Sequence, residues 1–140
     1  MAKVIISSTY GINQIADGSG LQIDASLLKT PLMETTALTS ATTLANGGLY
    51  TVSGGGALTM TMPLAASVPG AIFVVRNLSA HAHALTGSAE DSGTTVFTDG
   101  TSKGSKLTLA AAVGCSVSLI SDGKNFCVLA NSGSLTINGT

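Results

Sequence analysis

The sequence is poor in aromatic and charged residues. Its 140 residues include no tryptophan, aromatic residues make up 4% of the chain, and charged residues make up 9%. An ordinary soluble protein is about 25% charged. The polar surface here must therefore consist largely of the 17 serine, 18 threonine and 17 glycine residues. Because large rings provide much of the burial energy in most domains, we expect a core built mainly from aliphatic residues, methionine and alanine.

The low charge also excludes several classes of function. The six lysine and arginine residues are scattered and the net charge is −1, so no basic patch is available for nucleic acid. No apolar run approaches the roughly 20 residues that cross a bilayer. The apolar run at 4–6 is too short for a signal peptide, so we expect the protein to begin in a cytoplasm. Few charges give a free monomer little solubility, and we expect partners to cover much of the surface.

Signals for β-strands dominate the chain after residue 34. Residues 58–62 alternate between apolar side chains and threonine, and residues 115–119 alternate again, as in strands with one buried face. The apolar run at 71–76 predicts a strand that is buried on both faces or lies at the centre of a sheet. Further strands are predicted at 35–44, 49–53, 82–86, 94–98, 106–109, 125–130 and 135–137.

Glycine and the Asn-Gly and Asp-Gly pairs recur roughly every 8 to 12 residues, a spacing typical of sandwiches and barrels. No window shows a capped helical stripe of apolar residues. We therefore predict an all-β protein with less than about 10% helix. Its sandwich domain, residues 35–140, should contain about eight to ten short antiparallel strands.

The first 34 residues differ from the rest. They contain one short β-like run at 3–8, followed by glycine-rich turns and Pro31. We predict an extended arm over residues 1–34, with too little apolar surface to hold itself in place without the body or a neighbour. The alternative is a first strand and a long loop within the domain. The candidate contact residues of the arm are Val4, Ile5, Ile6, Tyr10 and Ile12.

The pair Asp122-Gly123 predicts a tight hairpin turn between strands at 115–121 and 125–130. With a two-residue turn, Cys115 and Cys127 point to opposite sides of the sheet. With a three-residue turn they share a side but lie four residues apart. Both separations are too long for a disulfide. We therefore predict two free thiols, which agrees with a cytosolic origin.

One motif resembles a catalytic one. Residues 100–104 match the Gly-x-Ser-x-Gly spacing, with Ser102 in the place of a nucleophile on a strand-to-helix turn. No helical pattern follows, because 106–109 is predicted as a strand. Both histidines, His81 and His83, lie upstream, whereas the hydrolase order places histidine downstream. We predict that 99–104 is a loop and that the protein is not an enzyme.

The same two histidines are the candidates for a zinc or copper site. At positions i and i+2 of a strand they would share a face, but a metal site needs a third or fourth ligand. Glu90 and Asp91 are the nearest carboxylates along the chain. The alternative is a pair of exposed or hydrogen-bonded histidines at a sheet edge. We favour that alternative and expect no metal and no cofactor.

Two stretches resemble a known class of protein. The run 57–63, followed by an Ala/Pro/Gly turn and the strand at 72–75, is similar to the middle of small β domains on tailed-phage virions. The run 114–126, with its Ser-Asp-Gly turn and an aromatic in the second strand, is similar to the end of such domains. The likeness covers roughly 44–130 and departs at Cys127, where a larger aromatic is common. A length near 140 residues without fibre repeats favours the capsid cement or decoration proteins.

The resemblance implies a jelly-roll sandwich that binds the outside of an icosahedral phage capsid. As a cement protein, it would bind the major capsid protein across capsomer seams and stabilise the DNA-filled head. It would self-associate, with a dimer favoured over a trimer, and bind neither nucleic acid nor membrane. It would pass from the host cytoplasm to the outer capsid surface. The alternative is a trimeric tail-fibre or receptor-binding module, present in few copies.

Overall fold

The computed structural model describes residues 5–6, 12–13, 35–88 and 96–139. The chain divides into two compact units, Met1–Met33 and Glu34–Thr140. In the first unit, β1 (Ile5–Ile6) pairs antiparallel with β2 (Ile12–Asn13). The second unit contains a short 3-10 helix (Ala65–Ser67) and the strands β3 (Thr35–Leu38), β4 (Gly48–Val52), β5 (Thr59–Thr61), β6 (Ile72–Asn77), β7 (His83–Thr86), β8 (Phe97–Thr98), β9 (Lys103–Gly104), β10 (Lys106–Leu109), β11 (Ser116–Ser121), β12 (Phe126–Ser132) and β13 (Leu135–Asn138).

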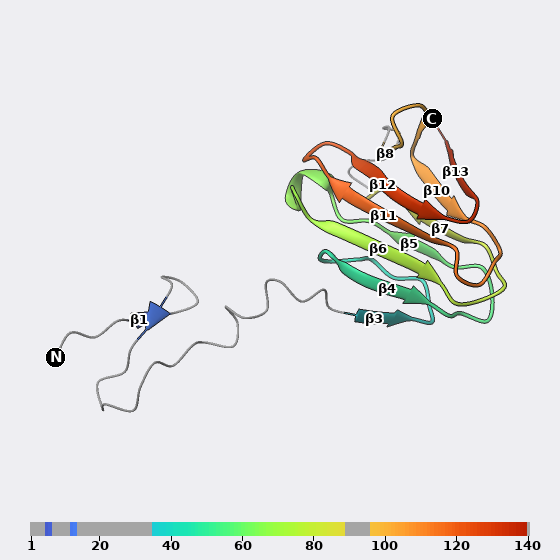
Figure 1. The fold of residues 1–140 in the computed structure, drawn as a ribbon, viewed down its shortest axis with the longest axis horizontal. Coiled ribbons are helices and arrows are strands. Elements are labelled where there is room, and N and C mark those ends of the chain that lie inside the picture. The colour runs from blue at the N-terminus through green and yellow to red at the C-terminus, as the bar shows by residue number, and fades with distance from the viewer. Residues whose placement is uncertain (1–4, 7–11, 14–34, 89–95, 140) are drawn as a thin grey trace. The chain divides into compact units, whose positions relative to one another are not determined.

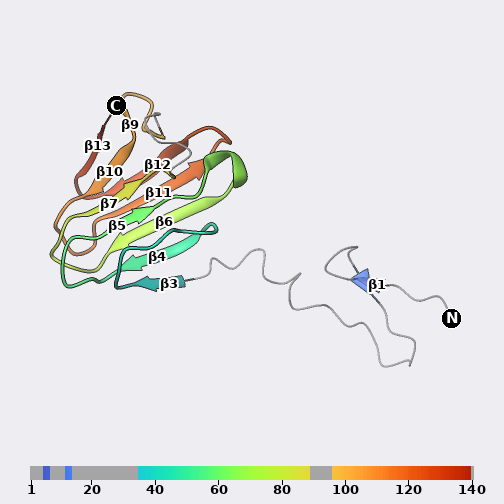
Figure 2. The same ribbon diagram turned by 180° about the vertical axis from the view of Figure 1, so that it is seen from behind.

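These strands form two sheets that pack as a sandwich (Figure 1). The larger sheet has seven strands in the order β3-β4-β6-β11-β12-β8-β9, and the smaller has four in the order β13-β10-β7-β5. The view from behind brings the smaller sheet to the front (Figure 2). Helix makes up 3% and strand 49% of the residues that the structure describes. The prediction of an all-β protein with little helix is confirmed.

The prediction of antiparallel strands throughout is wrong. Four neighbouring pairs run parallel: β3–β4, β4–β6, β5–β7 and β8–β12. From β4 to β7 the chain crosses between the sheets at every step, so strands that become neighbours are separated by two reversals and run in the same direction. Side-chain alternation does not encode strand direction. A jelly roll is built from antiparallel Greek keys. The sandwich is therefore confirmed, but the jelly-roll arrangement of its strands is not.

The connection from β3 to β4 also crosses to the smaller sheet before it returns to the larger one. Thr43 forms a parallel bridge with Thr61 of β5. On either side of this bridge, the N–H of Leu44 donates to Thr61 O at 2.8 Å and the N–H of Thr61 donates to Thr42 O at 2.9 Å. The segment therefore covers the free edge of β5 and closes one side of the sandwich.

The core lies between the two sheets and gathers the few aromatic rings. Phe73 of β6 stacks on Tyr50 of β4 at 6.3 Å between ring centroids, and it meets Phe126 of β12 edge to face at 5.6 Å. Phe97 of β8 lies 6.0 Å from Phe126. Such pairs add about 0.5–1.5 kcal/mol each beyond the burial of their area. The aliphatic core predicted from composition therefore has an aromatic centre.

The predicted alternations are confirmed where one face of a strand is buried. Met60 and Met62 are fully buried, whereas Thr59 between Leu58 and Met60 is exposed. The apolar strand β6 lies inside its sheet, between β4 and β11. Its outer face is not buried, because Ile72 is 44% exposed. Of the two alternatives for this run, the sheet-centre interpretation is correct and two-sided burial is wrong.

The hairpin between β11 and β12 has a longer turn than predicted. Ser121 pairs with Phe126, so four residues, 122–125, make the connection. The carboxylate of Asp122 causes this, because its Oδ1 accepts the N–H groups of Lys124 at 2.7 Å and Asn125 at 2.6 Å. These bonds lower the pKa of Asp122 below its usual value. The predicted two-residue register is wrong by two residues.

A second turn of the same design joins β8 to β9. Asp99 Oδ1 accepts the N–H groups of Thr101 and Ser102, and Gly100 has φ +91°. This bonding lowers the pKa of Asp99. The predicted loop at 99–104 is therefore a tight hairpin that ends in β9.

Both cysteines are free, as predicted. Cys115 is buried just before β11, and its thiol donates to Ser134 O at 3.4 Å. Cys127 is half-buried and pairs with Ile120. Its thiol donates to Asp122 Oδ2 at 3.6 Å. Partial burial and the neighbouring carboxylate raise the pKa of Cys127.

We expect the substitution Gly123→Val to lower the free energy of unfolding by about 1–2 kcal/mol, because a β-branched residue resists positive φ. Gly123 has φ +87°, and an added Cβ would meet only Pro69 Cβ at 3.7 Å, so the cost is in the backbone. The matched control is Gly55→Val, since Gly55 has open space around it and no positive φ. Urea denaturation measures both. Equal stability of the two variants would contradict the strained turn.

Candidate functional site

The predicted contact residues of the arm lie in the first unit. Ile5 and Ile6 form β1, and Ile12, which pairs with Ile6, begins β2. Val4 and Tyr10 lie outside the described residues. Their role in contacting a capsid or another subunit stays a prediction.

The Gly-x-Ser-x-Gly match does not form a nucleophile elbow. Ser102 is exposed in the β8–β9 turn, and its N–H donates to Asp99. The chain continues into β9 and β10 rather than into a helix. The strand predicted at 106–109 is confirmed as β10. The sharp strand-to-helix turn that exposes a catalytic serine is therefore not formed here.

The two histidines do not share a face. His83 is the first residue of β7 and is 1% exposed, whereas His81 lies before the strand and is exposed. The expectation of a shared face is wrong because the period of two applies only within a strand. In the described parts of the chain, no three His, Cys, Asp or Glu side chains gather as metal ligands do. Glu90 and Asp91 lie outside the described residues.

His83 instead belongs to a buried polar network. Its Nδ1 accepts the backbone N–H of Leu58 at 3.1 Å, and its Nε2 lies 2.7 Å from Ser79 Oγ. Asn77 is fully buried, and its Oδ1 lies 3.1 Å from the same hydroxyl. The amide nitrogen of Asn77 donates to the carbonyl oxygens of His81 at 2.8 Å and Ala110 at 3.0 Å. Every buried side-chain nitrogen and oxygen atom of this network has a hydrogen-bond partner.

The direction of these bonds determines what the Ser79–His83 pair can do. Because Nδ1 accepts an N–H, the neutral ring carries its proton on Nε2. Nε2 then donates to Ser79, and the Ser79 hydroxyl donates to Asn77 Oδ1. A serine nucleophile needs the opposite arrangement, in which histidine accepts the hydroxyl proton. The pair is oriented for structure and not for nucleophilic catalysis.

The network joins three connections at one end of the sandwich. It links the end of the β4–β5 connection at Leu58, the β6–β7 connection and the β10–β11 connection. Asn77 adds backbone bonds, as its N–H donates to Cys115 O at 2.7 Å and its carbonyl accepts from Gly114 at 2.8 Å. This role was not predicted from the sequence. The Asn-x-Ser spacing at 77–79 was the available signal, since asparagine often accepts the N–H two residues on, as Asn77 does from Ser79.

We expect the free energy of unfolding to fall as the pH drops below about 6.5. Burial, and then the nearby His81, lower the pKa of His83 from 6.5. The unfolded state therefore binds more protons between the two pKa values, and stability is lost as pH falls through the folded value. One site gives a slope of at most about 1.4 kcal/mol per pH unit. The pKa values of Asp99 and Asp122 are lowered from 3.8, so these two carboxyl groups titrate at more acidic pH and do not contribute to this slope.

Urea denaturation across this range measures the effect, with His83→Gln and His81→Gln as a matched pair. Glutamine at 83 can still accept from Leu58 and donate to Ser79, but it does not titrate. The His83 variant should lose the slope and the His81 variant should keep most of it. A slope that survives in His83→Gln would assign the pH dependence to another group.

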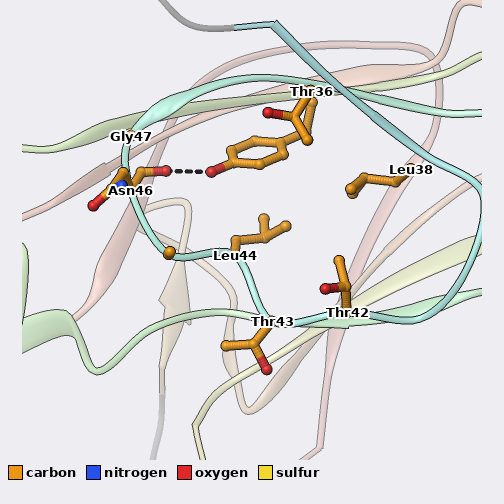
Figure 3. Close-up of a pocket in the computed structure, with 9 residues that line it drawn as sticks. Thr36, Leu38, Thr42, Thr43, Leu44, Asn46 and Gly47 are labelled. Carbon is orange, nitrogen blue, oxygen red and sulfur yellow. Dashed lines mark hydrogen bonds between the residues drawn. The ribbon is translucent and has the colours of Figure 1, made fainter.

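A cavity of about 220 Å³ lies beside β3 and β4 (Figure 3). Its lining is mostly hydroxyl and aliphatic: Thr36, Leu38, Thr42, Thr43, Leu44, Ala45, Asn46, Gly47 and Tyr50. The hydroxyl of Tyr50 donates to Asn46 O. The cavity is smaller than the roughly 300–1,000 Å³ of most ligand sites. Its chemistry suits an uncharged side chain better than a reacting substrate.

No protein-family profile and no curated protein matches the chain. None of the helical segments in the described residues has the length and apolar character needed to span a membrane.

Proposed function

We propose that this chain is a structural virion protein that binds the outside of an icosahedral phage capsid. Bound across capsomer seams, it stabilises the DNA-filled head as capsid cement proteins do. The resemblance of 57–63 and 114–126 to small β domains of tailed phages supports this proposal. The proposal includes a jelly-roll-like fold for the sandwich and assigns no catalytic step to the chain.

The observation that carries the proposal is the uncharged surface of the first strands of the sandwich. No charged residue occurs from Thr35 to Val75, which includes β3, β4, β5 and their connections. The outer face of the larger sheet presents exposed Ile72 and half-buried Leu49 and Val74 beside threonine and serine, and Arg76 at the end of β6 is the first charged side chain on it. Depletion of charge is typical of the centres of protein interfaces. Such a face suits contact with protein surfaces rather than with ions or nucleic acid.

The stabilising mechanism follows from linkage. A shell under internal pressure fails where capsomers separate. A protein that binds only the assembled state stabilises that state by mass action. When a copy on the closed lattice has bound one capsomer, the neighbouring capsomer is held close to it. The second contact then forms at a high effective concentration. Modest contacts of a low-charge surface are then sufficient, because they are repeated many times.

Purification of DNA-filled heads from the phage that encodes the chain tests the proposal. Quantitative mass spectrometry should find on the order of hundreds of copies per head, as lattice coverage requires. Heads lacking the protein should release DNA at a lower temperature, and added protein should restore the difference. A few copies on tails would instead favour the fibre or receptor-binding module. Complete absence from virions would refute both.

A further inference from the structure

The strand β3 forms one end of the larger sheet. On one side it pairs with β4 from Thr35↔Leu49 to Leu38↔Val52. Among the described residues, no strand pairs with its other side. Thr35, Thr36 and Ala37 are exposed. An end strand leaves a row of backbone N–H and C=O groups free to pair with another strand.

The edge of β3 has none of the chemical features that usually protect such strands. Proteins protect sheet edges with lysine, proline, bulges or inward charges. The sequence of β3 is Thr-Thr-Ala-Leu, and its pairing with β4 has no register shift. The adjoining segment 39–43 is exposed and uncharged. Nothing in this edge repels a second strand or a second copy of itself.

The opposite end of the same sheet is closed. There β9 carries the exposed Lys103, and Gly104 packs so closely on Asn138 of the smaller sheet that an added Cβ would clash with Asn138 O. The N–H of Ser105 also donates to Gly139 O at 2.7 Å. The larger sheet can therefore extend in one direction only, through β3.

We propose that β3 pairs with β3 of a second copy, antiparallel about a two-fold axis, so that the two larger sheets become one continuous sheet. The larger sheet has only this one open end, so a contact that joins two larger sheets must pair this edge with a copy of itself. An isologous contact of this kind closes after two subunits, whereas a head-to-tail contact would continue into a fibre. The absence of charge on β3 removes the repulsion that a two-fold axis would impose on like charges.

The cavity beside β3 adds to this fit. Thr36 and Leu38 line it, together with Leu44 and Tyr50, and Figure 3 shows Leu38 and Leu44 at its sides. A strand added to a sheet edge places alternate side chains on the same face as those of its neighbour. The inward side chains of the second copy therefore come to lie beside this cavity. Main-chain bonds supply affinity in such an addition, and side-chain space supplies selectivity.

The contact is small, because β3 has four residues. Interfaces below about 1,200 Å² are typical of weak association, so the dimer should form in a concentration-dependent way. Sedimentation velocity of the full chain, from low micromolar to near-millimolar concentration, should show a monomer–dimer equilibrium. Amide exchange over 35–38 should slow as the dimer forms.

The test variant is Thr35→Lys with Ala37→Lys, which places charges on the exposed side of β3. We expect it to stay monomeric at every concentration and to keep the circular dichroism spectrum and melting temperature of the wild-type monomer. The control is Thr136→Lys, an exposed position of the end strand β13, and it should dimerise like the wild type.

A wild-type chain that is monomeric at all concentrations would overturn the proposal. So would a trimer, or a lysine variant that dimerises as well as the wild type. If the lysine variant loses its spectrum, Thr35→Glu with Ala37→Glu repeats the test with the opposite sign of charge. The measurement needs no capsid, so its failure would be distinct from failure of the proposed virion role.

Discussion

Replacing Asn77 by alanine will lower the free energy of unfolding by about 3 kcal/mol or more. The side chain is fully buried and makes hydrogen bonds to His81 O, Ala110 O and the N–H of Ser79. Each such bond contributes about 1 kcal/mol, and a buried partner left without one costs about 1–3 kcal/mol. Alanine removes these three bonds together with the bond from the Ser79 hydroxyl to Asn77 Oδ1, and it leaves their partners in place. Urea denaturation followed by circular dichroism measures the change.

The matched control is Asn131→Ala in β12. Asn131 is exposed and donates a single hydrogen bond, to Gly133 O at 2.9 Å. Water can replace that bond, so this variant should stay within about 0.5 kcal/mol of the wild type. A loss below about 1 kcal/mol for Asn77→Ala would contradict the role of the network in holding this end of the sandwich.

Most strand positions could be predicted from the sequence because burial leaves a direct trace in it. The alternations at 58–62 and 115–119 place their apolar side chains in the core, as β5 and β11 show. The direction of the strands left no such trace. Parallel neighbours arise from the crossings between the sheets, and a side-chain pattern of period two is the same in either direction.

The hairpin register failed for a different reason. The pair Asp122-Gly123 correctly marked the turn, since Gly123 has positive φ. Its length was set by the side chain of Asp122, whose Oδ1 binds two N–H groups and includes Lys124 and Asn125 in the turn. A bulge at Ser118/Leu119 then shifts the rest of the pairing. Neither effect is visible in the apolar pattern.

The candidate functional sites also include one feature that the sequence predicts and one that it does not. That Ser102 lacks a following helix could be read from the strand pattern at 106–109. The Asn77–Ser79–His83 network could not, because its partners Leu58 and Ala110 lie 25 and 33 residues away along the chain. A histidine looks the same in sequence whether it binds a metal or a backbone N–H. Only the fold distinguishes the two.

Deleting residues 2–12 should leave a folded sandwich that binds heads at least tenfold more weakly. The unit Glu34–Thr140 has its own core, so its melting temperature should change little. The deleted segment carries five apolar side chains in a unit whose two paired strands have two residues each. A two-stranded hairpin is marginal by itself in water, so this segment should gain stability by docking on a neighbour.

The expected effect on binding is large because burial of each such side chain contributes at most about 1.5–3 kcal/mol. Ordering of the arm offsets part of this gain, and a net loss of about 1.4 kcal/mol already gives tenfold weaker binding. A full-length control replaces Val4, Ile5, Ile6, Tyr10 and Ile12 by serine. If apolar contact matters, it should bind as poorly as the deletion. If both variants bind and protect heads like the wild type, the capsid contact must lie on the sandwich, where the uncharged surface from Thr35 to Val75 is the remaining candidate.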